Sequence, residues 1–393
     1  MTAPKPVRVA YVCLDPGVPV FGNKGCSVHV QEILRAMVRQ GFSITLLTAR
    51  LGGPTPSGLE PIEVIQLPRL PRQDDPEFLP MVDRLALETG AALADLADLQ
   101  LIYERYSLWS CAAMEFARDH GIVSCLEVNA PLIYEQETYR EMHHKGLASE
   151  LSQRALRAAR SVLTVSTPLQ QMILHEDPEL ANVNVIANGV DTGRFCPPAA
   201  GQPAEAERPL TIGFSGTLKA WHGVEDLLAA FALHRRRFPG HQLRIIGDGP
   251  QRASLETKIR DLGLEQNVLL TGQVDSSTMP DQLCALDIAV APYPQLSRMY
   301  FSPLKIYEYM AMGLCTVASS AGDIPQIIEN GKTGLIYRAG NVEELASCLD
   351  TLASEPELRA SLGTQARRKA EDSYSWDQVL SASLSTLPDL AVR

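Results

Sequence analysis

The sequence predicts an α/β protein made of two doubly wound, Rossmann-like domains that face a central cleft. Three observations support this prediction. Apolar, β-rich runs alternate with helix-length segments along the whole chain, a pattern typical of parallel sheets joined by right-handed crossovers. At 393 residues, the chain is too long for one ordinary core. A loop rich in Pro and Ala, residues 197–203, divides the alternation into two similar runs.

The first half of the chain contains six apolar segments of strand length. Helix-length segments separate several of them, so each apolar segment predicts a strand of one parallel sheet. The predicted strands cover residues 7–12, 43–47, 101–103, 123–128, 161–165 and 183–187, and the predicted helices cover residues 28–40, 109–120 and 148–159.

The second half repeats this organisation with five more strand-like segments, each followed by a helical pattern. In parallel sheets of this kind, ligands bind beyond the carboxyl ends of the strands. The residues that directly follow each strand are therefore candidates for a binding site. These predicted strands cover residues 210–214, 242–246, 268–270, 288–292 and 314–318.

Composition restricts the class of protein. The net charge is −11 and no basic stripe is visible, which argues against nucleic acid as a partner. No apolar run reaches transmembrane length, and the N-terminus leads directly into a predicted strand rather than a signal peptide. The eight cysteines are scattered without a Cys-x-x-Cys pair, so we expect reduced thiols in a cytoplasmic protein and no zinc site.

A glycine-bearing loop follows the first predicted strand. It reads Gly22-Asn23-Lys24-Gly25-Cys26-Ser27 and leads into the first helix. Small residues let backbone approach a ligand, and the free N–H groups of a helix start suit an anion. The spacing G-x-G-x-x-G of dinucleotide-binding loops is absent. On the residues alone, both an anion-binding loop and a plain turn are open.

Three loops of the second half predict a shared ligand site. Gly216, Thr217 and Lys219 follow its first strand. Gly247 and Gly249 follow the second strand. Gly272, Gln273 and Val274 follow the third. Each loop is also compatible with ordinary turn chemistry, and Lys219 with a solvated lysine. Because all three loops lie on the same carboxyl edge, we expect them to converge on one ligand.

The segment 302–313 predicts a helix with an unusual first turn. Ser302 suits the N-cap, Pro303 the first helical position, and Gly313 the residue after the end. Lys305 and Glu308 could form an ion pair at i,i+3. Alternatively, Lys305 and the first-turn amides of Leu304 and Lys305 would bind a dianion, and Glu308 would accept the two hydroxyls of a ribose.

Taken together, these motifs resemble the retaining GT-B glycosyltransferases, specifically family 4 of the sugar-nucleotide-dependent enzymes. They occur in the family's order over nearly the whole chain. The resemblance is carried by the glycine loop at 22–27, the segments 187–191 with Phe195 and 214–219, the glycines at 247–250 and 271–272, the helix at 302–313 and Gly334-Leu335-Ile336.

The resemblance implies an N-terminal acceptor-binding domain (1–190, with 376–393 crossing back onto it) and a C-terminal domain (191–375) that binds a nucleotide-diphosphate sugar, most often a UDP-sugar. It implies that Glu308 holds the ribose. Lys219, Lys305 and the amides near Leu304 would contact the diphosphate, and Gly25 would approach it from the other domain. Transfer would proceed by a front-face mechanism without metal or other cofactor.

The chain departs from the family pattern at three places. Tyr300 stands where a Glu of the Glu-x7-Glu motif is expected, and the usual Arg and Lys of the diphosphate loop fall near Thr217 and His222. The segment 126–131 lacks the His that many members carry after a central N-terminal strand. The resemblance therefore does not predict which residues bind the hydroxyls of the donor sugar.

Acidic and amide side chains of the first half are candidates for the acceptor or sugar side. Glu127 near the reacting sugar and Asn129 as a donor to a hydroxyl are one interpretation, and a carboxylate that caps a loop is the other. Glu104 and Arg105 follow a predicted strand and would line the acceptor side or form a local salt bridge. The segment around Tyr134 is a candidate acceptor wall.

Two rival functions remain open on the sequence. A sugar-nucleotide 2-epimerase shares the nucleotide site, and a non-catalytic nucleotide-sugar-binding protein would explain Tyr300 and the missing His. The partners expected are a nucleotide-sugar donor and a hydroxyl-bearing acceptor whose identity the sequence does not predict. No basic amphipathic helix in the first half indicates membrane docking, although peripheral membrane contact is compatible with the sequence. The sequence does not predict an oligomeric state.

Overall fold

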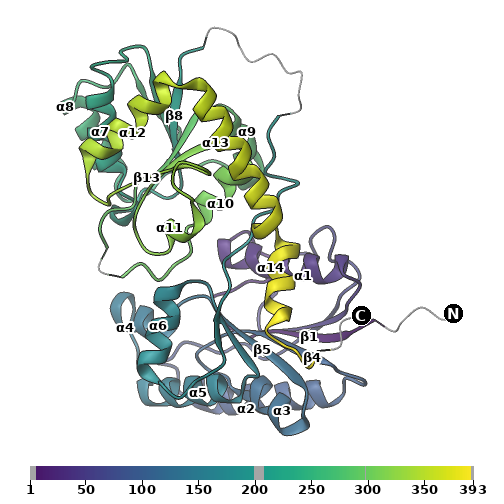
Figure 1. Ribbon diagram of the computed structural model, residues 1–393. Coiled ribbons are helices and arrows are strands. Elements are labelled where there is room, and N and C mark those ends of the chain that lie inside the picture. Colours follow the sequence, from purple (N-terminus) through teal and green to yellow (C-terminus); the bar gives the residue numbers. More distant parts are fainter. Residues whose placement is uncertain (1–5, 199–207, 297, 391–393) are drawn as a thin grey trace, which may run out of the picture. The chain divides into compact units, whose positions relative to one another are not determined.

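The computed structural model describes residues 6–198, 208–296 and 298–390. The chain forms two compact units (Figure 1). The N-terminal unit contains residues 1–187 together with 376–393, and the C-terminal unit contains residues 188–375.

The N-terminal unit is built on a seven-stranded parallel sheet with the strand order β3-β2-β1-β4-β5-β6-β7. The chain reverses its direction of winding between β1 and β4, so this pair forms the switch point of a doubly wound fold. The strands are β1 (Arg8–Cys13), β2 (Ser43–Thr48), β3 (Glu63–Gln66), β4 (Leu101–Arg105), β5 (Val123–Val128), β6 (Ser161–Thr164) and β7 (Val183–Val185).

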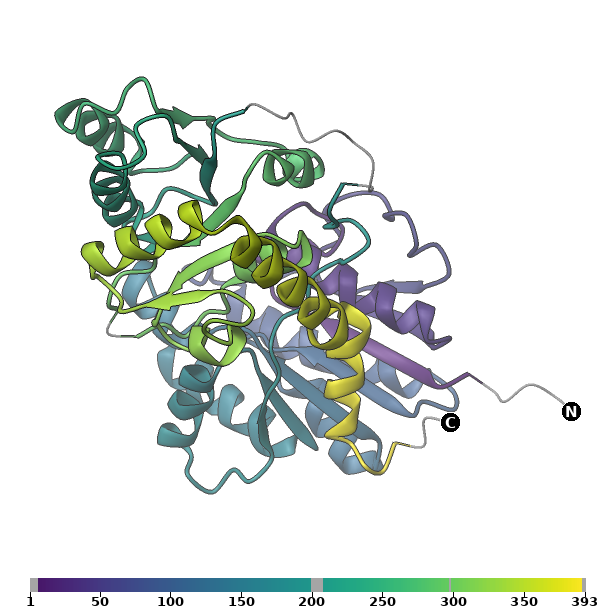
Figure 2. The ribbon, with the colours of Figure 1, turned by 45° about the horizontal axis from the view of Figure 1, so that its top comes forward.

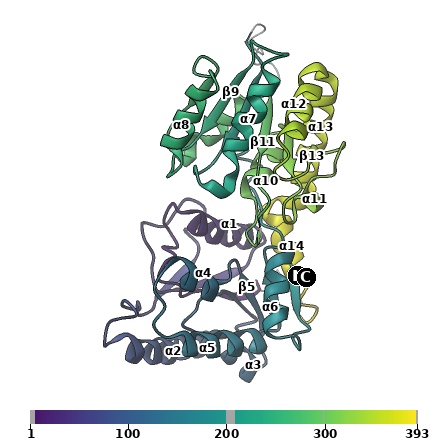
Figure 3. The same ribbon diagram turned by 90° about the vertical axis from the view of Figure 1, so that its left-hand side faces the viewer.

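Helices pack on both faces of this sheet. The last helix, α14 (Trp376–Ser385), lies beside α1 (Gly25–Arg39) and buries Trp376 and Leu380 in the same apolar core (Figures 1 and 2). The other helices of the unit are α2 (Phe78–Ala94), α3 (Ala112–His120), α4 (Leu132–Tyr139), α5 (Lys145–Ala158) and α6 (Thr167–Glu176). The row of α2, α3 and α5 is visible in Figure 3.

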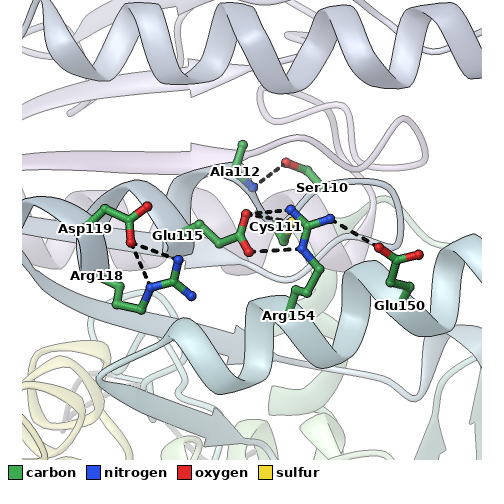
Figure 4. Close-up of polar contacts among 8 residues, drawn as sticks. All are labelled: Ser110, Cys111, Ala112, Glu115, Arg118, Asp119, Glu150 and Arg154. Carbon is green, nitrogen blue, oxygen red and sulfur yellow. Dashed lines mark hydrogen bonds and ion pairs between the residues drawn. The ribbon is translucent and has the colours of Figure 1, made fainter.

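An ion pair joins two helices of that row. Arg154 of α5 donates two hydrogen bonds to the carboxylate of Glu115 on α3, at 3.0 and 2.8 Å, and one to Glu150 (Figure 4). Cys111, at the start of α3, lies against Glu115, and burial raises the pKa of its thiol to about 12. The Arg154–Glu115 ion pair therefore stabilises the packing of α3 against α5, and the Cys111 thiol is not a reactive group.

The C-terminal unit has a six-stranded parallel sheet with the order β10-β9-β8-β11-β12-β13. Its strands are β8 (Thr211–Ser215), β9 (Gln242–Ile246), β10 (Val268–Leu270), β11 (Ile288–Ala291), β12 (Cys315–Ser319) and β13 (Leu335–Tyr337). Its helices are α7 (Val224–His234), α8 (Arg252–Asp261), α9 (Met279–Cys284), α10 (Leu304–Ala311), α11 (Ile324–Ile327), α12 (Val342–Ser354) and α13 (Pro356–Lys369). Two parallel, helix-covered sheets confirm the predicted fold class.

The buried strands account for most of what the sequence predicted. All eleven predicted strands are present, with ends that match or shift by up to two residues. The strands β3 and β13 and, in the N-terminal unit, the helices α2, α4 and α6 were not predicted. β3 is an edge strand whose residues are mostly exposed, so it shows no apolar run. α1 begins at Gly25, three residues before the predicted start at residue 28. The last residues of the predicted glycine loop therefore belong to the helix.

No helix in the described part of the chain has both the length and the apolar character needed to cross a membrane.

Candidate functional site

Three loops interlock at the carboxyl edge of the second sheet. They follow the neighbouring strands β8, β9 and β10, and the backbone N–H of Leu218 donates to the carbonyl of Asp248 at 2.9 Å. Gly247 forms a bridge to Gly272 and has a φ of +142°. A Cβ at position 247 would lie 2.1 Å from the carbonyl oxygen of Gly216. The three loops lie side by side at one edge, as expected, and their binding of one ligand stays a prediction.

The remaining predicted residues of these loops form their outer surface. Thr217 and Gln273 are exposed, and Val274 is partly buried. The N–H of Gly249 donates to the Asp248 carboxylate at 2.7 Å. The loops therefore present backbone and small side chains where a ligand would approach.

We expect Gly247→Ala to lower the free energy of unfolding of the C-terminal unit by about 3 kcal/mol. A positive φ costs an L-residue roughly 1–3 kcal/mol, and the Cβ would also overlap the Gly216 carbonyl. Urea unfolding of the full chain measures the change. Gly240→Ala is the matched control because a Cβ there meets nothing within 4 Å. Equal losses in the two variants would contradict this account of the loop packing.

Helix α10 begins one residue later than predicted. Pro303 is its N-cap residue, and no side chain caps the helix. Ser302 is not the N-cap, because its hydroxyl donates to the hydroxyl of Tyr307 at 3.4 Å. The N–H of Leu304 donates to the Ser302 carbonyl at 3.0 Å, so it is not open for a ligand. Within the described chain, the N–H of Lys305 is the predicted first-turn donor that has no partner.

The side chain of Lys305 is buried, with 7% of its surface exposed. Its Nζ donates to the Tyr293 hydroxyl at 3.3 Å and lies 4.6 Å from the centre of the Phe214 ring. A Cβ on Gly216 would lie 3.3 Å from Nζ. Burial lowers the pKa of Lys305 to about 7, although Glu308 opposes this shift. A buried ammonium without a counter-ion favours binding of an anion.

Lys305 and Glu308 do not form the i,i+3 ion pair that was one interpretation of the segment. No such contact is present in the described residues, and Glu308 is partly buried. Burial raises the pKa of Glu308 to about 7, while the positive charge of Arg194 opposes the rise. The two side chains thus form no direct ion pair, although the charge of each affects the pKa of the other.

Lys219 and His222 lie in the loop after β8. The Nζ of Lys219 lies 4.5 Å from the centre of the Trp221 ring, and the lysine is partly exposed. Burial, followed by the charges of Lys305 and Lys219, lowers the pKa of His222 to about 4. The neutral imidazole donates from Nδ1 to the carbonyl of Thr217. Positive charge at this edge therefore comes from the two lysines. Tyr300 lies in the loop before α10, with its ring against Phe301.

In the N-terminal unit, Glu127 lies inside β5 rather than capping a loop. Its Oε1 is 2.9 Å from Nε2 of His29 on α1 and accepts a hydrogen bond from the Tyr103 hydroxyl at 3.1 Å. Burial alone would raise the pKa of Glu127, but His29, Arg105 and Tyr103 outweigh it and hold the pKa below its usual value. Glu127 is therefore a buried carboxylate in its charged form.

Several polar side-chain atoms on α1, β4 and β5 and directly after β5 are buried without a hydrogen-bond partner in the described residues. They include Oε2 of Glu127, both side-chain atoms of Asn129, Nη1 of Arg105 and Oγ of Ser27. Arg105 and Glu127 are register partners on β4 and β5, so they share a face of the sheet. Buried polar atoms are normally hydrogen-bonded. This set offers both donors and acceptors, as a ligand with several hydroxyls requires.

Glu104 does not belong to this set, and neither the loop position nor the salt bridge predicted for it is present. Glu104 and Arg105 form the end of β4 rather than a loop after it. Glu104 pairs in register with Leu126, so it points to the face opposite Glu127. Its carboxyl oxygens have no partner in the described chain, and burial raises its pKa to about 8. Glu104 is therefore a neutral, buried acid near pH 7.

The predicted glycine loop lies at the start of α1. Gly25 is the first residue of the helix, and a Cβ there would meet nothing within 4 Å. No side chain caps this helix. Anion binding by the first-turn amides of α1 stays a prediction.

Comparison with known proteins identifies the family. A family model described as Glycosyltransferase Family 4 matches residues 23–194, and one described as Glycosyl transferases group 1 matches residues 209–355. The chain belongs to glycosyltransferase family 4. The two matched ranges include the glycine loop, Glu127 and helix α10.

Curated relatives are distant. The D-inositol 3-phosphate glycosyltransferase of Jonesia denitrificans is 25% identical over 428 residues, covering 98% of this chain and 97% of that protein. The glycogen synthase of Mycobacterium tuberculosis is 28% identical over 231 residues, covering 58% of this chain and 54% of that protein. This chain thus spans about half the length of the second relative and nearly all of the first.

Solved structures share the fold of this family 4 glycosyltransferase over both units. A glycosyltransferase from Rickettsia africae has a TM-score of 0.71 at 16% identity and covers 99% of each chain. HepE from Anabaena, solved in complex with UDP, has a TM-score of 0.69 at 17% identity and covers 98% of this chain and all of that chain. These likenesses confirm two Rossmann-like domains.

Sequence reasoning missed three residues that the structure brings to the candidate sites. His29 was not among the predicted site residues, although it faces Glu127. Tyr293 contacts Lys305, and its place between two prolines after a strand was the signal that could have found it. Arg194 affects Glu308 and donates to the carbonyl of Ser276. Only the folded chain reveals its position.

Proposed function

We propose that the protein is a retaining glycosyltransferase that moves a sugar from a nucleotide-diphosphate sugar to a hydroxyl group of an acceptor. One observation carries the proposal for the donor. Lys305 is a buried lysine that forms no ion pair with the described residues, placed at the first turn of α10 and against the loop at Gly216. Lys305, Lys219 and the open N–H of Lys305 would bind the diphosphate. Glu308, one turn further on, would accept the ribose hydroxyls.

The chemistry of this site favours a front-face displacement. The acceptor oxygen forms a bond to the anomeric carbon of the donor sugar, on the side from which the diphosphate oxygen departs. The departing phosphate oxygen takes the acceptor's proton, so no protein base is required. Lys305 and Lys219 stabilise the charge that develops on the leaving group, an effect worth roughly 3–4 kcal/mol per preorganised group. We propose that this charge makes a metal unnecessary.

Glu127 and Asn129 are proposed to hold sugar or acceptor hydroxyls. The free Oε2 of Glu127 and the amide of Asn129 have unused hydrogen-bonding capacity in a buried setting. A hydroxyl donates to the carboxylate and accepts from the amide, so each hydroxyl would satisfy two orphaned groups. His29 keeps Glu127 charged and fixed in place.

A screen of donor hydrolysis tests the proposal and identifies the donor. We favour a UDP-sugar because structural neighbours were solved with UDP and with UDP-glucose, while some relatives are named as GDP-mannose-dependent. UDP-, GDP- and ADP-sugars are incubated with the protein, with and without EDTA, and the anomer of the transferred sugar is read by NMR. An inverted product or dependence on a metal contradicts the mechanism. Conversion of the donor into an epimeric nucleotide sugar without an acceptor indicates an epimerase. Tight binding of the donor without turnover indicates a binding protein.

We expect the affinity for the donor to pass through a maximum near neutral pH. Diphosphate binding requires the ammonium form of Lys305, whose pKa is about 7 in the free protein, so affinity falls by up to about tenfold per pH unit on the alkaline side. The ribose contact requires the carboxylate form of Glu308, whose pKa is also about 7, so affinity falls on the acid side as well.

Calorimetric titration with UDP-glucose measures this dependence, because its diphosphate diester does not titrate near neutral pH. Lys305→Met should remove the alkaline fall and Glu308→Gln the acid fall. A profile that keeps both limbs in both variants would show that other groups bind the nucleotide.

A further inference from the structure

A small, mostly apolar pocket opens beside the polar cluster of the N-terminal unit. It lies between the end of β5, helices α4, α5 and α6, and the ring of Tyr106. Its volume is about 40 Å³, whereas one water needs about 10–15 Å³. The apolar lining residues include Val128, Leu132, Leu156 and Ile173.

Most residues of the lining are apolar. Of its polar groups, the hydroxyl of Tyr106 donates to the Ser152 hydroxyl at 2.8 Å, so these two groups already bind each other. Glu176 is the one charged residue that lines the pocket, and it is exposed. A ligand in this pocket would gain contacts from apolar groups rather than from polar ones.

Helix α4 forms a half-exposed wall of the pocket. None of its residues is buried, although Leu132, Ile133 and Tyr134 all line the opening. Apolar side chains on a helix normally pack against the core. Here they surround an open pocket, so this wall has room for a ligand.

The pocket adjoins the residues proposed to bind hydroxyls. Asn129, whose amide has no partner in the described chain, lies between Val128 and Ala130, which both line the pocket. Val128 and Glu127 point to opposite faces of the sheet because side chains alternate along a strand. A molecule that crosses the carboxyl end of β5 would thus meet the polar cluster on one side and the apolar pocket on the other.

We propose that this pocket binds an apolar group of the acceptor, so that the acceptor is a hydroxyl compound with an uncharged aliphatic substituent rather than a wholly polar saccharide. The assignment of the bound compound as an acceptor rests on the proposed transferase function, but binding to the pocket can be measured without turnover. The carboxylate of Glu176 disfavours an anionic substituent. Each methylene buried should strengthen binding by about fourfold until the pocket is full.

The methyl group of Met172, which lines the pocket, is a direct reporter. Protein labelled at the methionine methyl carbons is titrated with methyl, butyl, hexyl and octyl glucoside below their micellar concentrations, and the Met172 resonance is assigned with Met172→Leu. We expect a saturable shift of Met172 with butyl and longer glucosides, with a dissociation constant that falls with chain length until the pocket is full. No response should occur with methyl glucoside, and octanoate should bind more weakly than octyl glucoside.

A paired substitution separates pocket binding from general hydrophobic association. Leu132→Gln places a polar group in the half-exposed wall and should weaken hexyl glucoside binding at least tenfold. Leu79→Gln makes the same change on α2, where Leu79 is 44% exposed outside the pocket, and should have no effect. Equal effects of the two variants, or shifts of all methionines alike, overturn the proposal. Saturable binding without sugar transfer to octyl glucoside would instead argue against the proposed transfer function and leave the pocket assignment standing.

Discussion

Turnover of the proposed transferase is expected to fall about 100-fold or more when Lys305 is replaced by methionine. Lys305 is the buried positive charge at the first turn of α10, and a preorganised charge at a leaving group contributes roughly 3–4 kcal/mol. Methionine preserves most of the side-chain volume against Phe214 and Tyr293. Initial rates at saturating donor measure the change.

The same substitution should leave the protein folded. Removing an ammonium that burial destabilises relieves a cost to the native state, so the melting temperature is expected to stay within a few degrees of the wild-type value. Lys332→Met is the control, because Lys332 is exposed in the same unit and pairs with Glu329 at 2.7 Å. Unchanged turnover of Lys305→Met, or an equal loss in the control, would remove Lys305 from the proposed diphosphate site.

Glu127→Gln is expected to lower kcat/KM by about 10- to 100-fold. The glutamine oxygen still accepts from His29 and Tyr103, so the internal hydrogen bonds persist. The atom at the free Oε2 position becomes a donor and can no longer accept from a ligand hydroxyl. A lost hydrogen bond to a charged group costs about 1.5–3 kcal/mol.

Two readouts separate ligand binding from a purely structural role of Glu127. The melting temperature of Glu127→Gln should change little, whereas Glu127→Ala should be destabilised because His29 loses its partner. Glu115→Gln makes the same charge change at the ion pair between α3 and α5, and its kcat/KM should equal that of the wild type. If Glu127→Gln loses stability but retains kcat/KM, Glu127 is a structural residue only.

Most of the predicted strands were found because they are buried on both faces. Such strands read as continuous apolar runs, and β5 (Val123–Val128) was predicted to the residue. β3 was missed because it is largely exposed and has no apolar run. β13, whose three residues are apolar but mostly only half-buried, was also missed.

The candidate site was predictable where it depends on topology. Parallel strands place their following loops at one edge, so the shared edge of the loops at Gly216, Gly247 and Gly272 could be predicted, whereas their direct contacts depend on the strand order that the structure shows. Side-chain environments were not predictable. Ser302 looked like an N-cap, yet its hydroxyl reaches Tyr307, and Glu104 looked like a loop residue, yet it ends a buried strand on the other face.

By itself, the sequence determined the family, the two parallel sheets and the position of Lys305 and Glu308 on one turn of α10, because these depend on local pattern and chain order. Only the tertiary structure decided that Lys305 is buried against Phe214 without a counter-ion and that His29 pairs with Glu127 across 98 positions of sequence. The physical reason is that burial and ion pairing depend on which distant segments pack together. Those contacts set the charge states on which the proposed chemistry rests.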